Sequence, residues 1–271
     1  MEGVPVLIDH DSSVFKLEDI QDMSKVQTPH TAARAKRLVP KLSSNMTAHR
    51  VYHDLRNRLL LQPQSIILSI GGGDGGIGIE HLMDPRIIIL ITDVMIGPGV
   101  DYAVDAHSLP FPDGTFDLVI AQAVLEHVAD PAQCVREIHR VLRPNGLVFA
   151  ETPFMQQVHL GRYDFTRFTH LGHRRLFRDF HELESGQVAS AATALAWSLT
   201  NFLTSFTNSR RTRQAVDLCG RVLFGWLKYL DPLVARHAGS WDAASAFYFL
   251  GSRADEALTD TELIRGYRGL R

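Results

Sequence analysis

The fold is decided by residues 66–76, Ile66-Ile67-Leu68-Ser69-Ile70-Gly71-Gly72-Gly73-Asp74-Gly75-Gly76, where an apolar run ends in a loop of glycines. β-Branched residues bounded by a glycine cluster predict a buried strand followed by a tight turn. Glycines at the carboxyl end of a strand let the backbone approach a bound nucleotide closely, and they permit positive φ. We therefore expect a nucleotide-binding loop after the first strand of a sheet.

Similar strands recur along the middle of the chain. Together with residues 65–70, the runs at 86–92, 116–121 and 146–151 are rich in β-branched residues, and each ends in a turn or helix signal. Residues 130–142 carry apolar side chains at helical spacing and are closed by Arg-Pro-Asn-Gly. Strands that alternate with helices predict a doubly wound α/β sheet of parallel strands.

Two more strands are predicted after this core, at residues 177–188 and 246–251. Residues 189–206 and 211–230 predict two helices between them, so we expect a helical insertion before the last strand. Insertions of this length near a site often form lids.

The two ends of the chain are predicted to be helical. Residues 31–61 favour helices broken at Pro40, and the capping-box pattern Thr259-Asp260-Thr261-Glu262 predicts a short final helix. We divide the chain into an N-terminal helical cover (1–62), a core (63–188), a helical cap (189–240), and a last part with the final core strand and C-terminal helix (241–271).

The composition restricts the classes of function. Of 271 residues, 45% are apolar and 21% are charged, and the formal net charge is -2, without the basic excess of a general nucleic-acid binder. Cys134 and Cys219 lie far apart without a CxxC, so we expect neither a disulfide framework nor a cysteine zinc site. The first residues lack a secretory signal pattern, and the uncharged residues 187–209 are too rich in Ser and Thr for a membrane span. We therefore expect a cytoplasmic protein.

The glycine loop alone leaves the identity of the nucleotide open. Gly71, Gly73 and Gly76 satisfy the dinucleotide pattern GxGxxG, and Asp93 follows at the end of the next strand, where a carboxylate can hold ribose hydroxyls. An NAD-dependent oxidoreductase fits this part of the sequence. A tight turn without a ligand, with Asp93 and Asp105 as turn caps, is the plainer alternative.

The segment after Asp93 separates these interpretations. It reads Asp105-Ala106-His107-Ser108-Leu109-Pro110-Phe111-Pro112-Asp113-Gly114-Thr115-Phe116-Asp117-Leu118-Val119, followed by Val124-Leu125-Glu126-His127-Val128 and by Glu137-Ile138-His139-Arg140-Val141-Leu142-Arg143-Pro144-Asn145-Gly146. From about residue 65 to residue 152 the sequence resembles the class I S-adenosylmethionine-dependent methyltransferases, specifically the type-11 methyltransferase domain group. The resemblance implies a seven-stranded Rossmann-like sheet, S-adenosyl-L-methionine as the cofactor, and methyl transfer as the activity. It opposes the oxidoreductase.

The resemblance also implies a cofactor site. The glycine loop would pass under the methionine part of the cofactor, and Asp93 would accept hydrogen bonds from both ribose hydroxyls. Asp105 would contact the adenine amino group, and Gln122 and Ala123 would lie near the sulfonium. Ser69 stands where the family usually has an acidic residue, which keeps open a non-catalytic S-adenosylmethionine-binding partner protein. The implied cofactor set is Ser69, Gly71, Gly72, Gly73, Asp74, Gly75, Asp93, Val94, Asp105, Ala106, Gln122 and Ala123.

Polar side chains gather in residues 152–177, directly after the fifth strand. Ligands of a doubly wound sheet bind beyond the carboxyl ends of its strands, so this segment is the predicted acceptor side. Transfer from a sulfonium is an in-line displacement, and a hydroxyl acceptor then needs a base, for which His159 or His173 is suited. We expect no metal, because the spacing of these histidines and Asp164 fits no recognised site. The candidate catalytic set is His159, Tyr163, Asp164, Arg167 and His173.

The same segment suggests the class of acceptor. Arg167 lies between aromatic neighbours, so it needs a partner such as Asp164 or the substrate. The further arginines of residues 162–178 suit an anionic acceptor or form a solvated helix face. A similar run, Pro-Phe, then His159, then Tyr-Asp-Phe-x-Arg-Phe-Thr at residues 163–169, occurs in bacterial methyltransferases of this group, some suspected of acting on cell-surface glycans or lipids. We therefore expect methyl transfer to an oxygen or nitrogen of a small, anionic or lipid-linked sugar acceptor.

Three features of the sequence bear on the partners and on the border of the active site. The apolar helices within residues 189–230 are flanked by arginines, so they either touch a membrane interface or pack on the sheet or on a second copy in a homodimer. Glu126-His127 either borders the active site or only shapes a helix start. The fourth strand ends Ala121-Gln122-Ala123-Val124, without the Asn/Asp-Pro-Pro-aromatic sequence associated with methylation of base amino groups, so no nucleic-acid partner is expected.

Overall fold

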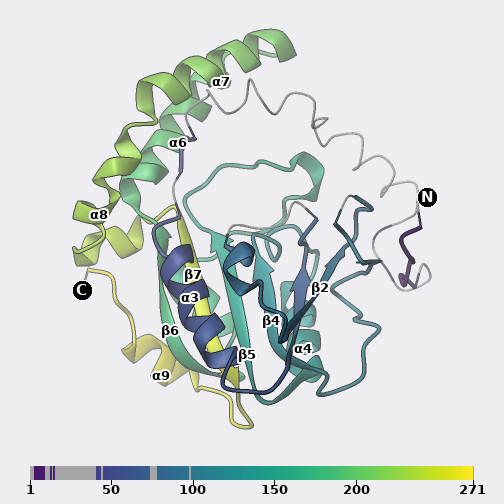
Figure 1. The fold of residues 1–271 in the computed structure, drawn as a ribbon. Helices are drawn as coiled ribbons and strands as arrows, with labels where there is room; N and C mark the ends of the chain where they lie inside the picture. Colours follow the sequence, from purple (N-terminus) through teal and green to yellow (C-terminus); the bar gives the residue numbers. More distant parts are fainter. Residues whose placement is uncertain are drawn as a thin grey trace.

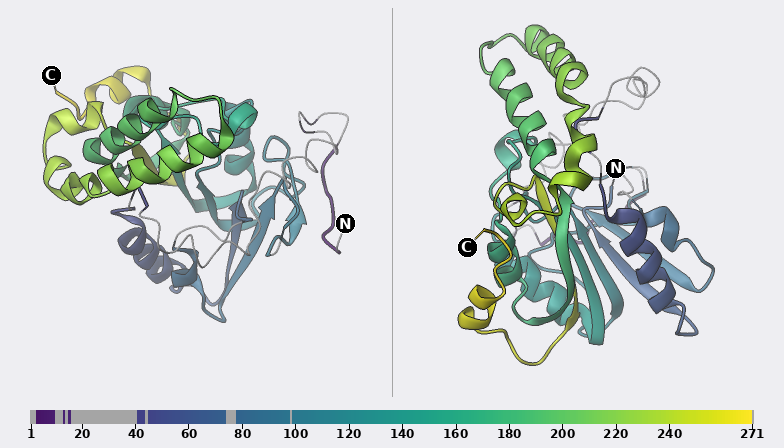
Figure 2. Two further views of the ribbon diagram at one scale, coloured as in Figure 1. Left: turned by 90° about the horizontal axis from the view of Figure 1, so that it is seen from above. Right: turned by 90° about the vertical axis from the view of Figure 1, so that its left-hand side faces the viewer.

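The fold is built on one seven-stranded sheet in the order β3-β2-β1-β4-β5-β7-β6. The computed structural model describes residues 3–9, 13, 15, 41–43, 45–73, 78–97 and 99–270. Figures 1 and 2 show the twisted sheet with helices on both of its faces. The strands are β1 (Ser65–Ile70), β2 (Ile87–Asp93), β3 (Tyr102–Ala103), β4 (Phe116–Gln122), β5 (Leu142–Pro153), β6 (Phe180–Ala189) and β7 (Ala246–Arg253).

The strand directions confirm the doubly wound core. β1, β2, β3, β4 and β5 pair in parallel, whereas β7 runs antiparallel to both β5 and β6. All six predicted strands are present. The two-residue strand β3 was not predicted, because it is too short to show a pattern. β5 begins at Leu142 rather than at residue 146, and Asn145 holds a left-handed φ of 61° near its start, which explains why this stretch resembles a turn in the sequence.

Alternation along the strands produces two hydrophobic layers. Successive side chains of a strand point to opposite faces, so Ile67 and Leu118 face one side while Leu68 and Val119 face the other. Helix α3 (Ala48–Leu59) covers the first face through buried residues that include Tyr52. Helix α4 (Pro131–Val141) covers the second face through Val135, Ile138 and Val141, and the side chain of its N-cap Asp130 accepts a hydrogen bond from Gln133 N at 2.9 Å.

The insertion before the last strand is helical, as predicted. It contains α6 (Ala191–Thr204), α7 (Arg210–Phe224), η4 (Leu227–Leu230), α8 (Asp231–Val234) and η5 (Ala238–Asp242). Figure 2 shows α6 and α7 standing beyond the edge of the sheet. The second helix is shorter than expected, since α7 ends at Phe224 and a 3-10 turn follows. Among the described residues, no helix has the length and apolar character needed to cross a membrane.

Buried contacts tie the insertion to the sheet. The carboxylate of Asp231 is fully buried and accepts hydrogen bonds from Ser190 N, Thr193 N and Thr193 Oγ1 at 2.6–3.0 Å, so it caps the start of α6. Gly220 of α7 lies against Thr200 of α6, where an added Cβ would come within 2.7 Å of Thr200 Cγ2. This close approach keeps the two helices side by side.

The ends of the described chain also support the core. The predicted capping box is present, with Thr259 N donating to Glu262 Oε2 at 2.8 Å, and it starts α9 (Asp260–Arg265). Near the N-terminus, Val6 bridges Ala103 in parallel and so extends the sheet beside β3. The predicted helix over residues 31–40, and Asp74, Gly75 and Gly76 of the glycine loop, lie outside the described residues. The four-part division of the chain stays a prediction.

Candidate functional site

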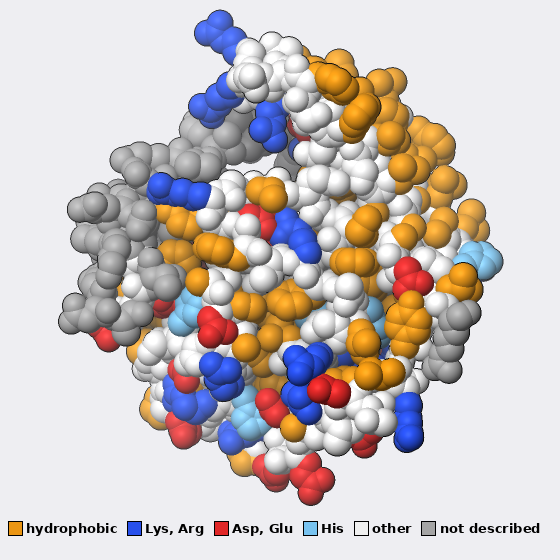
Figure 3. All heavy atoms as spheres, turned by 180° about the vertical axis from the view of Figure 1, so that it is seen from behind, with side chains coloured by type: hydrophobic (Ala, Val, Ile, Leu, Met, Phe, Trp, Pro, Cys, Tyr) orange, Lys and Arg blue, Asp and Glu red, His pale blue; other side chains and the backbone are white. Residues whose placement is uncertain are grey.

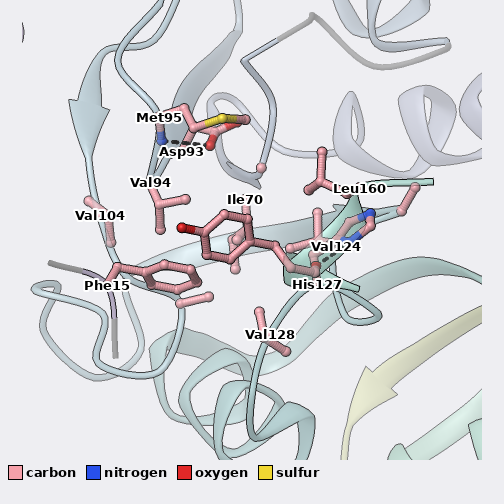
Figure 4. A pocket seen from close by; sticks show the side chains of 14 residues that line it. Phe15, Ile70, Asp93, Val94, Met95, Val104, Val124, His127, Val128 and Leu160 are labelled. Carbon is pink, nitrogen blue, oxygen red and sulfur yellow. Dashed lines mark hydrogen bonds between the residues drawn. The ribbon is translucent and has the colours of Figure 1, made fainter. Parts of the chain in front are cut away.

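A pocket lies at the carboxyl ends of β1, β2 and β4, where a doubly wound sheet binds its ligands (Figure 4). One end is formed by the acidic end of β2, and the other by the loop after β4 and by the β5–α5 segment, which we define as residues 154–169. The lining residues are Phe15, Ile70, Gly71, Asp93, Val94, Met95, Val104, Ala106, Ala123, Val124, His127, Val128, Leu160 and Tyr163.

The glycines after β1 are required by close approach. Gly71 has a φ of 65°, and a Cβ on it would lie 2.4 Å from Val124 Cγ2 in the pocket wall. A Cβ on Gly73 would lie 2.8 Å from Asp93 Oδ2, and one on Gly72 would lie 2.7 Å from the hydroxyl of the buried Ser69. The missing side chains therefore let the loop lie directly against the end of β2.

Asp93 ends β2 and lines the pocket, as predicted for a residue that holds a ligand there. Its Oδ2 accepts from Gly73 N at 3.1 Å. Its Oδ1 accepts from Met95 N at 2.9 Å (Figure 4). These backbone donors hold a carboxylate that is only 7% exposed. A fixed carboxylate can accept two hydrogen bonds from neighbouring hydroxyls.

Asp105 does not line the pocket, and its contact with adenine stays a prediction. Its carboxylate is 3% exposed and accepts hydrogen bonds from Ser13 Oγ, from His107 N at 2.9 Å and from His107 Nδ1 at 2.6 Å. Burial acts to raise the pKa of Asp105, but the hydrogen bonds from His107 and Ser13 outweigh it and hold the pKa below its usual value. The side chain of Asp105 therefore lies behind the pocket surface, and its neighbour Ala106 lines the pocket.

A similar division occurs after β4. Ala123, with a φ of 55°, lines the pocket, whereas Gln122 does not and donates from Nε2 to Glu151 Oε2 at 2.9 Å. Asn45 donates to the other oxygen of Glu151 at 2.8 Å. Burial raises the pKa of Glu151. Ala123 lies at the pocket, where it was expected, and its contact with the sulfonium stays a prediction. The side chain of Gln122 instead joins the end of β4 to Glu151 of β5.

The β5–α5 segment is held by Arg167. This side chain forms an ion pair with Asp164 and donates to Gln156 O at 2.8 Å and to Gln157 O at 3.2 Å. The expected partner of Arg167 is therefore Asp164. Burial acts to raise the pKa of Asp164, but the hydrogen bonds from Arg167 and His159 N and the positive charge of Arg167 together outweigh it and lower the pKa to about 2. The pair is ionised and fixes the segment that carries His159 and Tyr163.

His159 meets a second histidine from the loop after β4. The Nε2 atoms of His127 and His159 lie 3.0 Å apart, and His127 Nδ1 lies 2.8 Å from Tyr163 O. Glu126 is fully buried behind them, with its Oε1 3.7 Å from His127 Nε2 and 3.9 Å from His159 Nε2. Burial raises the pKa of Glu126 to about 8 and lowers the pKa of both histidines. Of the two interpretations of Glu126-His127, the structure favours the one in which the pair borders the pocket, because His127 lines it.

His173 does not lie at the pocket, and we drop it from the candidate catalytic set. It lies in α5 (His170–Leu176), is 1% exposed, and packs against Phe177 and Phe249 at ring distances of 5.2 and 6.4 Å. Burial lowers its pKa to about 3, so it stays neutral and dry. Its neighbours Arg174 and Arg175 form ion pairs with Glu182 and Asp260.

Several pocket residues were missed by the sequence analysis. Phe15 reaches the pocket because the N-terminal segment extends the sheet at β3, and nothing in its local sequence signals this contact. Met95, Val124 and Leu160 are apolar wall residues without a chemical signature. His127 had a signal, since it is one of two adjacent ionisable residues directly after a strand end.

The fold and the pocket together define a class of protein. The strand order, with β7 antiparallel between β5 and β6, is that of the class I methyltransferases, and the pocket lies at the carboxyl ends of the parallel strands. Comparison with known proteins agrees. Residues 93–150 match the family model described as a methyltransferase domain. In this segment the chain is therefore similar to S-adenosylmethionine-dependent methyltransferases, and its sheet has their class I fold.

Individual relatives share the same segment. The chain is 49% identical over 45 residues to a Mycolicibacterium smegmatis protein named "Probable S-adenosylmethionine-dependent methyltransferase", covering 17% of this chain and 18% of that one. It is 33% identical over 98 residues to the ubiquinone/menaquinone biosynthesis C-methyltransferase of Hahella chejuensis, covering 30% and 39%. The chain thus matches less than half the length of these relatives.

Solved structures support the fold. The 1,6-didemethyltoxoflavin-N1-methyltransferase of Burkholderia thailandensis, solved with 1,6-didemethyltoxoflavin and S-adenosylhomocysteine bound, aligns over 92% of this chain and 94% of its own. Its TM-score is 0.50 and its sequence identity is 13%. At this identity the likeness concerns the fold, and it includes the sheet that forms the pocket.

Proposed function

We propose that the protein transfers the methyl group of S-adenosylmethionine to an oxygen or nitrogen of a small, anionic or lipid-linked sugar acceptor. The observation that carries the proposal is the pocket, which is apolar along its length, acidic at Asp93, and bordered by imidazoles at the other end. An adenosyl ligand has hydroxyls for a carboxylate and a flat ring for apolar walls. The methyl group would then lie toward the imidazole end.

The chain's own residues account for positioning in this reaction. Asp93, held by two backbone donors, would orient the ribose, and Ala106 and Val128 would bound the ring. Because displacement at a sulfonium already has a good leaving group, alignment of the acceptor supplies much of the rate. His127 or His159 would accept the proton of a hydroxyl acceptor, since burial keeps both imidazoles neutral near pH 7.

Two surfaces of the protein support the proposed class of acceptor. Arg162, next to the pocket residue Tyr163, is exposed and offers a positive charge to an acidic group. The helical insertion carries exposed apolar side chains, shown as the orange margin at the upper right of Figure 3, which suit a lipid-linked acceptor or a second copy of the chain. We propose that the protein works in the cytoplasm, with this face toward a membrane or a partner subunit.

Calorimetric titration with S-adenosylmethionine, S-adenosylhomocysteine and NADH tests the cofactor. We expect saturable binding of both adenosyl ligands, none of NADH, and loss of binding in Asp93→Ala. The matched control is Asp54→Ala, which removes an exposed carboxylate on α3. Binding of NADH alone would support the oxidoreductase instead. Adenosyl binding without turnover on any glycan or lipid-linked sugar would support the non-catalytic alternative.

A further inference from the structure

Three side chains from two separate segments converge at the imidazole end of the pocket. Glu126 and His127 follow β4, and His159 lies in the β5–α5 segment. The Nε2 atoms of His127 and His159 lie 3.0 Å apart. Glu126 Oε1 lies 3.7 Å from His127 Nε2 and 3.9 Å from His159 Nε2. Their spacing in the sequence does not indicate a site, and only the packing of the β5–α5 segment brings them together.

The carboxylate of Glu126 lacks a hydrogen-bond partner. Its side chain is 0% exposed, and neither oxygen has a partner among the described residues. Buried polar groups in folded proteins are almost always satisfied, because leaving a carboxylate dry and unpaired costs several kilocalories per mole. The imidazoles of His127 and His159 lie within 4 Å of Oε1. The side chain is therefore aimed at a position between them.

The hydrogen bonds of the two histidines fix where their lone pairs point. Nδ1 of His127 lies 2.8 Å from Tyr163 O, and a carbonyl only accepts, so this Nδ1 carries the proton. Nδ1 of His159 lies 3.4 Å from Gln157 O and 3.4 Å from Asp164 Oδ2, which are also acceptors. Each neutral imidazole then has its lone pair on Nε2. Two lone pairs 3.0 Å apart repel each other unless a cation lies between them.

The three ligand atoms have the spacing that a metal ion needs. A point equidistant from them lies about 2.1 Å from each atom, which is the length of a zinc–imidazole bond. The Nδ1 atoms bound to a backbone carbonyl and to a carboxylate match the outer contacts that orient metal-binding histidines. Beside Glu126 the nearest charged groups are Asp164 and Arg167, which form an ion pair whose charges cancel. Glu126 becomes the negative ligand when a cation displaces its proton.

We propose that Glu126, His127 and His159 bind a divalent transition-metal cation of the zinc type beside the cofactor pocket. Two histidines and one carboxylate leave coordination positions open, and His127 lines the pocket, so an open position faces the acceptor. This replaces the expectation of no metal, which considered His159 with Asp164 and His173 and not with the residues after β4.

The use of the cation rests on the proposed function, whereas its binding does not. When the cation is bound, the Nε2 lone pairs of His127 and His159 are its ligands, so the cation takes over from these imidazoles the activation of a hydroxyl acceptor. A hydroxyl oxygen of the acceptor bound at the open position loses its proton to solvent more readily. The oxygen's electron pair then forms the new C–O bond as the S–C bond of the sulfonium breaks, and that bonding pair returns to sulfur as the thioether. A nitrogen acceptor that already carries a free lone pair gains less from the cation.

Metal titration of the untagged protein tests the site. After dialysis against EDTA, zinc binding is followed by calorimetry, and Co²⁺ binding by the visible absorption that a four- or five-coordinate site produces. We expect one equivalent of metal per chain, and affinity reduced by about 100-fold or more in Glu126→Gln and in His159→Ala. The matched control is His53→Ala, which removes an imidazole whose side chain is 64% exposed on α3 and which should leave the affinity unchanged.

The variants separate loss of ligand from loss of fold. His159 is 31% exposed, so His159→Ala should keep the fold even if the buried Glu126→Gln does not, and circular dichroism checks both. Absence of saturable zinc and cobalt binding in the wild-type protein would overturn the proposal and leave a shared proton between the two Nε2 atoms. Unchanged affinity in His159→Ala would also overturn it. Metal binding without S-adenosylmethionine binding would support the site and refute the proposed function.

Discussion

Gly73 shows how one absent side chain shapes the pocket. An added Cβ would lie 2.8 Å from Asp93 Oδ2, so valine at this position must displace either the loop or the carboxylate. We expect Gly73→Val to abolish S-adenosylmethionine binding in calorimetry, because Asp93 lines the pocket and the backbone N–H of Gly73 helps to hold its carboxylate. Gly239→Val is the control, since nothing lies within 4 Å of a Cβ there. Unchanged cofactor affinity in Gly73→Val would place the cofactor elsewhere.

Arg167 organises the acceptor side without lining the pocket. Its ion pair with Asp164 and its bonds to Gln156 O and Gln157 O fix the shape of the β5–α5 segment. The segment is joined to the loop after β4 where Phe165 N donates to Glu126 O at 2.8 Å. We expect Arg167→Ala to bind the cofactor within a few-fold of wild type but to lose turnover by about 100-fold or more, because a displaced acceptor side misaligns the reaction. Turnover on an identified acceptor, measured beside cofactor affinity, checks this split.

Two further variants sharpen the Arg167 prediction. Arg167→Lys keeps the charge but loses the planar fork of donors, so it should restore little activity. Arg175→Ala removes an exposed arginine that pairs with Asp260, and it should behave as wild type. Full turnover in Arg167→Ala would show that the acceptor binds away from the β5–α5 segment.

At the scale of elements, the strands followed from the sequence and several helices did not. Buried parallel strands are short continuous runs of β-branched residues, so β1, β2 and β4 carry their own signal. β3 has two residues and pairs only because β2 lies beside it. The end of α7 at Phe224 was also missed, because apolar residues continue into η4 and hide the break.

The outer face of the inserted helices is the clearest unassigned surface. Phe202, Phe206 and Trp226 are 61%, 75% and 56% exposed, and the rings of Phe202 and Phe206 pack edge-to-face against each other. Exposed apolar patches of this kind mark contact with another protein or with a membrane. The face is separate from the pocket-lining residues, so changes here should leave the cofactor site intact.

We therefore expect Phe202→Ser combined with Trp226→Ser to weaken association without changing S-adenosylmethionine affinity. Analytical ultracentrifugation reports loss of a dimer, and co-sedimentation with vesicles reports loss of membrane binding. Ile264→Ser, at a 63% exposed apolar residue of α9, is the matched control. If the double variant and the control give the same mass and the same vesicle binding as wild type, neither a partner subunit nor a membrane uses this face.

At the scale of the whole molecule, stability should depend on two buried histidines. Burial lowers the pKa of His170 and of His173 to about 3 in the folded protein, below the ordinary value of 6.5. A histidine with a lowered pKa contributes stability that is full above pH 6.5 and is lost as the pH falls toward 3. The free energy of unfolding should therefore decrease on acidification through this window.

The variant His173→Phe measures that dependence. It should reduce the slope of unfolding free energy against pH by about 1.4 kcal/mol per pH unit between roughly pH 6 and pH 4, the value for one proton. Urea unfolding at a series of pH values gives the slope. His181→Phe, at an exposed position of β6, is the control and should keep the wild-type slope. Equal slopes in all three proteins would show that His173 is protonated in the fold.

The sequence by itself determined the layered α/β class, the glycine loop, and the placement of Asp93 at a strand end. Each depends on local patterns: β-branched runs, missing side chains, and alternation that assigns Ile67 and Leu68 to opposite faces. Parallel strand ends then meet at one edge by geometry alone. The pairing of Arg167 with Asp164 was also predictable, because a cation among aromatic neighbours needs a nearby acid.

Only the tertiary structure decided which of these residues face the pocket. The carboxylate of Asp105 is bound by Ser13 and His107 behind the pocket surface. His173 is buried among aromatic rings, and His127 contacts His159 beside Glu126. Two of these contacts, Ser13 with Asp105 and His127 with His159, join residues 92 and 32 positions apart, and they arise from how segments without regular structure cross the sheet edge. The local sequence does not predict the course of these segments, because packing of the whole chain sets it.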